Sequence, residues 1–252
     1  MPKGKVYIGT SGWVYYDWEG IFYPEKCKDK LSFYSQYWKT VEINSSFYHL
    51  PREKTFLNWY NRVSADFVFA VKVNRTITHL KRLRNINDIW FTFLSRASLL
   101  QEKLGPLLIQ FPASFPATPE NISYLEDFLS LSKEYSKQLP VKNLLLACEF
   151  RHPSWFSSLV YDLLYKYKVA LVIADSSRYP KQEIVTADFV YVRMHGPTIL
   201  FGSEYTASQL KQLARKIKNW SSKGLDCYIY FNNDYKGYAI TNAKQLLSFL
   251  KL

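Results

Sequence analysis

The sequence predicts an α/β fold, a single-domain TIM (β/α)8 barrel over residues 1–252, from three observations. Eight short apolar runs recur along the chain. Stretches with helical spacing separate most of these runs, and no linker or low-complexity segment interrupts them. Because strands that alternate with helices are typical of a parallel sheet, and eight repeats close a barrel, we expect one closed barrel.

The eight expected strands are rich in valine, isoleucine, leucine and aromatic residues, as buried strands are. In chain order they are 5–9, 40–47, 66–74, 105–111, 144–150, 169–175, 189–196 and 226–233. Seven stretches carry apolar residues at helical spacing, and several begin at Ser, Thr, Asp or Asn, the residues that cap helices. These expected helices are 29–39, 53–63, 87–104, 119–135, 155–167, 206–220 and 241–250.

The sixth connection is the weak repeat of this pattern. Residues 176–187 are too few and too polar for a full helix. A doubly wound open sheet is the alternative fold, but such a sheet more often has a glycine-rich phosphate turn after its first strand. The segment 9–13, GTSGW, lacks the full dinucleotide spacing, so the barrel is favoured.

Composition indicates a basic, densely packed protein. Hydrophobic residues make up 48% of the chain, which excludes a disordered protein. Lys and Arg number 33 against 21 Asp and Glu, a net charge of +12 that favours anionic partners such as phosphates, nucleic acids or acidic metabolites. The alternative is a basic surface that serves solubility alone, although the run 79–84, HLKRLR, is dense.

The cysteines and the apolar runs bear on the compartment. Cys27, Cys148 and Cys227 are odd in number and widely spaced, with no CxxC motif, so we expect buried thiols in a reducing compartment. The first residues contain no continuous apolar signal segment, and no apolar run approaches the roughly 18 residues of a membrane span. A cytoplasmic protein without a membrane partner is the expectation.

Polar residues gather where the expected strands end. The fifth strand runs into 149–155, EFRHPSW, although charged groups leave water only at a cost of several kcal/mol unless they are paired. Within each strand the polar members lie an even number of residues apart and so share a face. In a barrel this end holds the active site. The set is Ser11, Glu42, Asn44, Lys72, Asn74, Gln110, Glu149, Arg151, Asp175, Arg193, His195 and Asn232.

A structural interpretation competes with a functional one. Three acids, Glu42, Glu149 and Asp175, face three bases and could neutralise them as a polar plug; the bases are Lys72, Arg151 and Arg193. Replacing such a network with apolar residues is often neutral or stabilising, so stability alone explains it poorly. The position at the barrel mouth favours function.

Seven segments of the chain resemble a known family in their order and spacing. The segments are EINSSFY, VKVNRTITH, GPLLIQFP, CEFRHPSW, IADSS, YVRMHG and YIYFNND. They are similar to the signature segments of the DUF72 family, the YecE-like proteins, from Gly9 to beyond Asn233. The resemblance implies a TIM barrel, and it implies an unsettled activity, because the family is named for its unknown function.

The resemblance also implies which positions correspond to the polar strand-end positions of the family. They are Glu42, Asn44, Tyr48, Lys72, His79, Gln110, Glu149, Arg151, His152, Trp155, Asp175, Arg193, His195, Gly196, Asn232 and Asn233. For His79 and His152, simple surface exposure is the competing interpretation.

We expect catalysis without metal from side chains that move protons. Glu149 or His195 is the natural general acid or base, while Lys72, Arg151 and Arg193 are donors for a substrate anion or an oxyanion. Lys72 is alternatively a Schiff-base nucleophile, if burial beside cations lowers its pKa. The expected catalytic residues are Glu149, His195, Lys72 and Asp175. The expected substrate-binding residues are Glu42, Asn44, Tyr48, Gln110, Arg151, His152, Trp155, Arg193, Asn232 and Asn233.

Within this set the two arginines have a specific expected role. Arg151 and Arg193, on the fifth and seventh strands, form a clamp on one carboxylate or phosphate, because the planar guanidinium suits both groups. In the competing structural interpretation the acids engage both guanidiniums and leave no free donors.

A divalent metal is the less favoured chemistry. Glu149, Asp175 and His195 occupy places similar to metal ligands of the sugar-isomerase and endonuclease IV-like barrels. The eighth-strand position is Asn232, a weaker ligand than a carboxylate, and Arg151 and Arg193 repel cations. We therefore expect no resident catalytic metal.

Aromatic residues follow the first two strands and border the expected mouth. Tyr15 and Tyr16 lie after the first strand, and Tyr48 follows the second. They suit stacking on a sugar or a base, or they form a self-packed lid. The favoured function is an enzyme, a hydrolase, lyase or isomerase, that acts on a small anionic substrate, including a phosphate-bearing one. The alternative is a nucleic-acid-binding or endonuclease IV-like protein that uses its basic surface.

Overall fold

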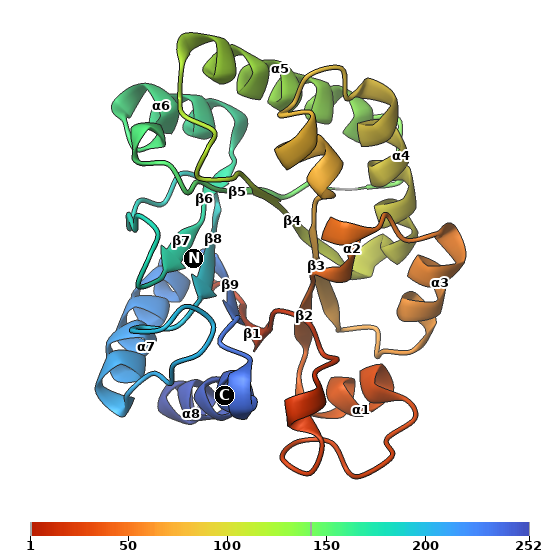
Figure 1. The fold of residues 1–252 in the computed structure, drawn as a ribbon, viewed down its shortest axis with the longest axis vertical. Coiled ribbons are helices and arrows are strands. Elements are labelled where there is room, and N and C mark those ends of the chain that lie inside the picture. Colours follow the sequence, from red (N-terminus) through yellow and green to blue (C-terminus); the bar gives the residue numbers. More distant parts are fainter. Residues whose placement is uncertain (1, 142, 252) are drawn as a thin grey trace.

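The strands of the molecule form two parallel sheets that surround a common centre, with helices outside them (Figure 1). This computed structural model describes residues 2–141 and 143–251. The strands are β1 (Val6–Thr10), β2 (Thr40–Ile43), β3 (Val68–Lys72), β4 (Leu104–Gln110), β5 (Leu146–Glu149), β6 (Ala170–Leu171), β7 (Ile173–Asp175), β8 (Phe189–Met194) and β9 (Asp226–Phe231). One sheet has the order β1-β9-β8-β7 and the other β2-β3-β4-β5-β6.

All seven expected helices are present, and an additional short one follows β2. The helices are α1 (Lys30–Tyr37), α2 (Ser45–Tyr48), α3 (Glu53–Asn61), α4 (Asn87–Ala97), α5 (Pro119–Ser136), α6 (Ser158–Tyr167), α7 (Ala207–Ser222) and α8 (Tyr238–Leu250). Predicted caps are confirmed: Asp29, Thr118 and Thr206 each accept a hydrogen bond from a backbone amide in the first turn. Short 3-10 or π segments lie at η1 (Tyr16–Trp18), η2 (Thr76–Leu80), η3 (Ser98–Lys103), η4 (Pro153–Trp155) and η5 (Tyr235–Gly237).

The predicted sixth strand is split into β6 and β7 and connects the two sheets. Between the halves lies Val172, whose amide donates to the carbonyl of Cys148 at 2.9 Å. The first half pairs with β5 and the second with β8. The predicted lack of a helix after this strand is confirmed, since residues 176–188 contain none.

The other junction lies between β1 and β2, where the ladder is nearly absent. A single parallel bridge joins Ser11 to Glu42, and the Gly12 amide donates to the Glu42 carbonyl at 2.8 Å. The Tyr34 hydroxyl, from α1, fills the rest of the junction: it accepts from the Thr10 amide at 3.0 Å. It also donates to the Thr40 carbonyl at 3.1 Å. The expectation of a continuous closed barrel is therefore corrected, because a side chain replaces backbone pairing here.

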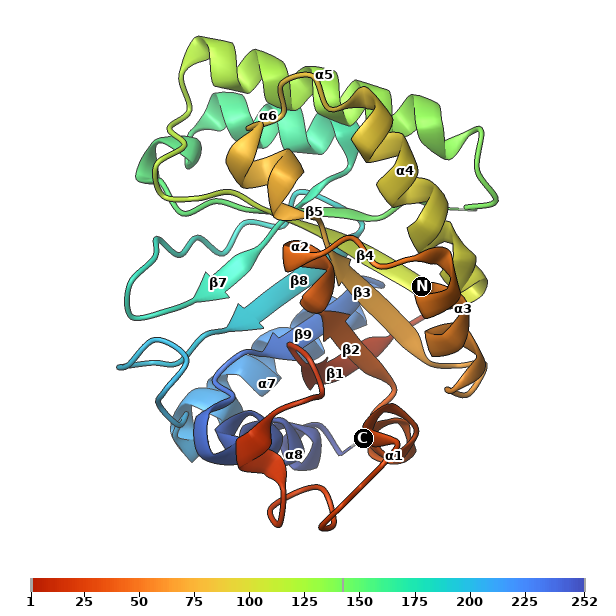
Figure 2. The same ribbon diagram turned by 45° about the vertical axis from the view of Figure 1, so that its right-hand side comes forward.

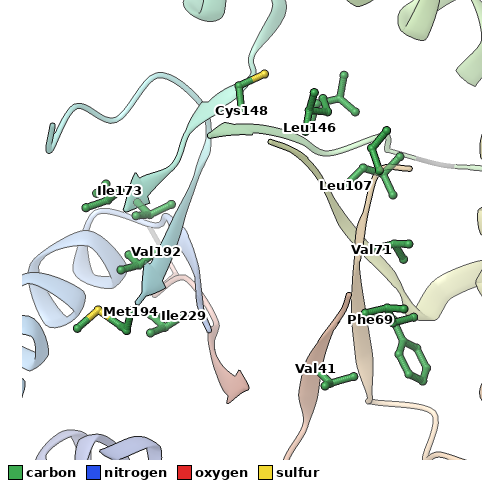
Figure 3. Close-up of a cluster of buried hydrophobic side chains, with 14 of the residues drawn as sticks. Val41, Phe69, Val71, Leu107, Leu146, Cys148, Ile173, Val192, Met194 and Ile229 are labelled. Atoms are coloured by element: carbon green, nitrogen blue, oxygen red, sulfur yellow. The ribbon is translucent and has the colours of Figure 1, made fainter. Parts of the chain in front are cut away.

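Alternation along the strands separates an outer core from an inner one. Figure 3 shows that side chains such as Phe69, Val71, Leu146 and Cys148 point away from the centre, toward the helices. Alternate residues face the centre and form a second buried cluster, aliphatic on β3 to β7 and aromatic on β8 and β9. Its members are Ala70, Leu108, Ala147, Ala170, Val172, Ala174, Phe189, Tyr191, Tyr228 and Tyr230. The same alternation turns Glu42, Lys72, Glu149 and Arg193 inward at the carboxyl ends of their strands. Figure 2 shows the strands and the helices around them in a second view.

Two smaller observations concern the cysteines and the helices. Cys148 and Cys227 are buried free thiols, as predicted, whereas Cys27 is only half-buried. None of the helices in the described ranges combines the length and the apolar character that crossing a membrane requires.

Candidate active site

Arg193 lies at the centre of the polar cluster and is almost completely buried. Its Nε and Nη2 donate to the two carboxylate oxygens of Glu42 at 3.0 and 2.8 Å. Its Nη1 donates to Glu149 at 2.7 Å. The Ser11 and Tyr191 hydroxyls add a hydrogen bond each to Glu42, both at 2.7 Å. Every nitrogen of this guanidinium is therefore engaged, which corrects the expectation that Arg193 is a free arm of an anion clamp.

Glu149 is the second buried carboxylate and is held in its ionised form. Arg151 Nε donates to it at 3.0 Å, and His195 Nε2 lies 3.4 Å away. Burial alone would raise the pKa of this carboxyl, but the charges of Arg193 and Arg151 and the hydrogen bond from His195 hold the pKa well below its usual value. Glu149 thus lacks a proton to donate at neutral pH, which argues against its expected role as general acid.

His195 is buried beside this pair and is held in one orientation. Asn232 Nδ2 lies 3.0 Å from its Nδ1 and, as a donor, leaves the proton on Nε2, which faces Glu149. Burial, together with the charge of Arg193, lowers the pKa of the imidazole, so the ring is neutral at pH 7. The ring lies beneath the cavity lining rather than in it.

Lys72 is a buried cation with neither an acidic partner nor a hydrogen-bond acceptor among the described residues. Its side chain is 9% exposed, its Nζ lies 4.2 Å from the centre of the Phe47 ring, and none of the described residues forms a hydrogen bond or ion pair with it. Lys103 is a useful comparison, because it is 5% exposed and also lies 4.2 Å from a tyrosine ring, that of Tyr60. Lys103 donates to two backbone carbonyls at 2.7 and 2.9 Å, whereas Lys72 donates to none in the described structure.

This difference has an electrostatic consequence for Lys72. Burial, followed by the charge of Arg193, lowers the pKa of the ammonium to about 7. Glu149 and Glu42 oppose this shift, but both already bind Arg193. At neutral pH a large fraction of Lys72 is therefore the uncharged amine.

A cavity of about 340 Å³ opens beside Lys72 at the carboxyl ends of the strands. It contains six of the predicted site residues: Asn44, Tyr48, Lys72, Arg151, Arg193 and Asn232. Asn44 Oδ1 is a buried acceptor that finds no partner in the described parts of the chain. The cavity thus presents free donors and one free acceptor to any molecule that enters it.

Three predicted site residues do not line this cavity and have other partners. Asp175 accepts from the Tyr205 hydroxyl at 2.8 Å and from Lys181 at 2.6 Å, outside the polar cluster. Trp155 is fully buried, with its indole N–H donated to the Phe115 carbonyl. Asn233 is fully buried and donates to the Ser203 carbonyl and Asn242 at 2.9 Å each.

Two further predicted residues, Gln110 and His152, have mainly local partners. Gln110 Nε2 lies 3.4 Å from His79 Nε2 and donates to the Phe111 carbonyl. His152 Nδ1 accepts from the Ser154 amide, which caps η4. Neither residue lines the cavity.

The possible metal ligands Glu149, Asp175 and His195 do not converge. Across 2–141 and 143–251, no group of three or more His, Cys, Asp or Glu side chains has an arrangement that would hold a metal ion. Asp175 is the residue that departs from the proposed set, since Lys181 and Tyr205 occupy its oxygens. The residues present therefore do not fit the isomerase-like or nuclease-like metal site.

Two cavity residues, Asp234 and Phe201, were missed by the sequence prediction. Burial raises the pKa of Asp234 to about 6. The residue directly follows the FNN segment of the ninth strand, so extending the strand-end set by one residue would have found it. Phe201 has φ of 63°, which is unusual for an aromatic residue, and its ring contacts His195. No sequence signal distinguishes it.

Comparisons with known proteins agree with this architecture. The family model "Protein of unknown function DUF72" matches residues 7–252. UPF0759 protein YunF of Bacillus subtilis is 25% identical over 279 residues, covering 98% of this chain and 95% of YunF. UPF0759 protein YecE of Escherichia coli is 31% identical over 153 residues, covering 60% of this chain and 50% of YecE.

The structural comparison covers nearly the whole chain. The crystal structure of a DUF72 family protein from Thermotoga maritima superposes with a TM-score of 0.86 at 29% identity, covering 98% of this chain and 100% of that one. The predicted family resemblance is thus confirmed over nearly the entire length, and the α/β fold with it. The chain belongs to the DUF72 family, whose function is unknown.

Proposed function

We propose that this protein is an enzyme that acts on a small anionic substrate in the cavity beside Lys72. The observation that carries the proposal is the buried Lys72 ammonium without an acidic partner among the described residues. An uncompensated buried charge destabilises a fold by several kcal/mol, so a structural role does not account for it. A substrate that supplies the missing negative charge, or that uses the uncharged amine, does.

Charge balance separates this proposal from a purely structural polar plug. The plug needs three acids for three bases, but Asp175 is paired with Lys181 at 2.6 Å. Of these three acids Glu42 and Glu149 remain, and Arg193 engages both. Asp234 also lines the cavity but forms no ion pair with Lys72 in the described structure, so Lys72 still lacks an acidic partner.

Arg151 is the residue that we assign to the substrate anion. Its Nε donates to Glu149 and its Nη1 donates to the Tyr179 hydroxyl at 3.2 Å. The Tyr179 ring also stacks at 4.1 Å from the guanidinium centre, and the side chain keeps 16% of its surface exposed. The Nη2 donors remain for a carboxylate or phosphate, which the guanidinium binds well.

Two groups in the cavity have pKa values suited to proton transfer near neutral pH. Lys72 has a pKa of about 7, and Asp234 has a pKa of about 6. General acid–base groups work best when their pKa lies near the working pH. These two residues replace Glu149 and His195 as the expected proton carriers, so the enzyme class stays hydrolase, lyase or isomerase.

A ligand screen tests the proposal. The wild type is equilibrated with a mixture of cellular metabolites, and retained compounds are identified by mass spectrometry after rapid separation. We expect an anionic small molecule to be retained, with about tenfold or greater weakening in Arg151→Gln, the effect of losing a hydrogen bond to a charged group. Lys103→Met, a buried lysine outside the cavity, is the control and should bind as the wild type does.

A screen that retains only uncharged compounds, or anions that bind equally well to Arg151→Gln, would overturn the proposed function.

A nucleic-acid-binding role is the alternative, and the run 79–84 supports it. Lys81 and Arg84 are exposed there, and Arg84 lies 3.5 Å from Glu120. Binding to a generic DNA or RNA duplex that falls steeply with salt would favour this role, because phosphate contacts release counterions. Its dependence on Lys81 and Arg84, rather than on Lys72, would separate it from the enzyme proposal.

A further inference from the structure

We propose that Lys72 is a nucleophile that forms an imine with an aldehyde or ketone carrying an anionic group. This inference rests on the proposed function and specifies it: the substrate is a small anionic carbonyl compound, and the reaction is of the lyase or isomerase class. Four features support it, namely the fixed backbone of Lys72, the charges that face its amine, the free acceptor Asn44 and the titrating Asp234.

The backbone of Lys72 is held rigidly at the end of β3. The Ser46 hydroxyl donates to the Lys72 carbonyl at 2.6 Å, and Asn74 Nδ2 donates to the Ser46 carbonyl at 2.9 Å. These bonds fasten the short helix α2 to the strand. Because Phe47 belongs to the same helix, its ring is fixed against the lysine Nζ at 4.2 Å. A nucleophile placed in this way loses little freedom when it attacks.

The charged groups around the amine come from several strands. Arg193 on β8 and Arg151 after β5 disfavour the ammonium, while Glu149 on β5 and Glu42 on β2 favour it. His79, on η2, is neutral, since burial and the charge of Lys72 lower its pKa to about 4. With both carboxylates bound to Arg193, none of these groups in the described structure accepts a proton from Lys72 by direct contact.

The chemical step balances with water as the only other product. The amine lone pair attacks the carbonyl carbon and forms a C–N bond while the electrons of the C=O π bond move to the oxygen. The nitrogen then loses one proton, which passes to this oxygen and gives a neutral carbinolamine. A second proton converts the hydroxyl into water, which leaves as the nitrogen lone pair forms the C=N bond. The protonated imine then withdraws electrons from the adjacent carbon, so a neighbouring C–H or C–C bond breaks more readily. Hydrolysis by water restores the amine.

Two other cavity residues suit the remaining requirements of this step. Asp234, with a pKa of about 6, exchanges protons near neutral pH and can protonate the departing hydroxyl. Asn44 Oδ1, buried without a partner among the described residues, can accept a hydrogen bond from the carbinolamine or from a substrate hydroxyl. An imine-forming site needs such groups, whereas a simple anion site needs only cations.

Reductive trapping tests the inference. The protein is incubated with glyoxylate and sodium cyanoborohydride, which reduces an imine to a stable secondary amine, and modified lysines are identified by peptide mass spectrometry. Lys72 should be modified about tenfold or more faster than exposed lysines at neutral pH, because about half of it is uncharged there and only about one ordinary lysine in several thousand is. The rate should rise with pH to a midpoint of about 7.

Acetaldehyde, which lacks the carboxylate, serves as the matched probe. We expect Arg151→Gln to slow trapping of glyoxylate at Lys72 about tenfold more than it slows trapping of acetaldehyde, because acetaldehyde trapping loses only the effect of the Arg151 charge on the pKa of the amine. Lys72→Arg should abolish trapping at this position, and Lys103→Arg should not affect it. Modification of Lys72 no faster than that of exposed lysines, with either probe, would overturn the inference.

The two proposals fail in different ways. If the ligand screen retains an anion that depends on Arg151 but Lys72 is never trapped, the imine is wrong and the proposed function stands. If Lys72 is trapped selectively but Arg151→Gln slows both probes equally, the amine is a nucleophile and the anionic part of the proposed function is wrong.

Discussion

Lys72 and Lys103 show how differently a fold can treat a buried lysine. Both are less than 10% exposed and both lie over a tyrosine or phenylalanine ring, yet only Lys103 has hydrogen-bond acceptors in the described structure. Burying an ammonium without acceptors costs free energy, and that cost appears as a lowered pKa. Lys72 therefore weakens the fold in which it is placed.

The first prediction is that Lys72→Met stabilises the protein by a few kcal/mol near pH 6.5. The pKa of Lys72 is about 7 in the folded state and about 10.4 in the unfolded chain, and each pKa unit corresponds to about 1.4 kcal/mol. Below pH 7 the folded protein carries the whole penalty. As pH rises from about 7 to about 10.4 the unfolded chain holds the extra proton, so the stability of the wild type increases.

Urea titrations at about pH 6.5 and about pH 9.5 measure this effect. The stability advantage of Lys72→Met should shrink between the two values. Lys103→Met should instead be destabilised, because two backbone carbonyls lose their donor. An advantage of the same size at both pH values would contradict the lowered pKa.

The second prediction concerns Arg193, which links the two carboxylates. Arg193→Ala leaves Glu42 and Glu149 without their main counter-charge, so we expect a loss of about 3–5 kcal/mol in the free energy of unfolding. Arg151→Ala should cost less, since Arg151 is more exposed and contacts one carboxylate. Equal losses in the two variants, measured by urea titration, would show that Arg193 is not the centre of the network.

The direction of a single side chain was predictable from the sequence where strand alternation determines it. Lys72, Glu149 and Arg193 face the centre because they follow apolar inward positions at a spacing of two. Partners were not predictable, since Glu42 and Arg193 are 151 residues apart and meet only through the closure of the sheets. Asp234 and Phe201 belong to loops, where no periodicity indicates direction.

At the scale of elements, helix α1 supplies the side chain that joins strands β1 and β2. The Tyr34 hydroxyl occupies the place of a ladder hydrogen bond between β1 and β2. Gly9 permits this close approach, because a Cβ there would lie 2.2 Å from the Thr40 carbonyl oxygen.

The third prediction follows from that hydroxyl. Tyr34→Phe should lower the free energy of unfolding by about 1–3 kcal/mol, because the Thr10 amide and the Thr40 carbonyl lose a buried partner. Hydrogen exchange of the Thr10 amide should accelerate in the same variant. Tyr37→Phe, in the same helix but more than half exposed, is the control and should leave both quantities unchanged.

The sequence anticipated the number and order of elements better than their limits. Apolar periodicity predicted every long helix and all eight strand positions, and it predicted the missing helix after residue 175. It did not predict the break at Val172, because β6 and β7 share one continuous apolar run. It also missed α2, whose four residues are too few to show a helical period.

At the scale of the whole molecule, the acids of the site differ from the set that the sequence suggested. Asp175 lies outside the polar cluster and Asp234 lines the cavity instead. A divalent cation there meets Lys72, Arg151 and Arg193, while Arg193 already engages Glu42 and Glu149. The positive charges of these bases therefore repel a divalent cation and oppose its binding.

The fourth prediction is that protein purified without added metal contains less than about one equivalent of tightly bound divalent ion. Elemental analysis after extensive dialysis measures it, with buffer from the same dialysis as the blank. Stoichiometric zinc, manganese or iron that disappears in Glu149→Ala would reverse this expectation and revive the metal-dependent analogy.

The pairing of β1 with β9 sets an order for folding during synthesis. The sheet from β2 to β6 comes from one continuous segment, 40–171, and each of its strands finds a partner soon after it leaves the ribosome. β1 pairs with β9, which lies more than 200 residues later in the sequence, so β1 has no partner strand until β9 has been synthesised. Contacts this distant in sequence form slowly. Pulse-labelled exchange should accordingly show the amides of Val6–Thr10 protected last, and early protection there would refute it.

Glu42, Lys72 and Glu149 belong to the early sheet, whereas Arg193, His195 and Asn232 arrive with the late one. A chain that stops before β9 contains Arg193 and His195 but lacks Asn232 and Asp234, and its β1 has no partner strand. We therefore expect the polar cluster and its cavity to be completed only when the last strand has been made.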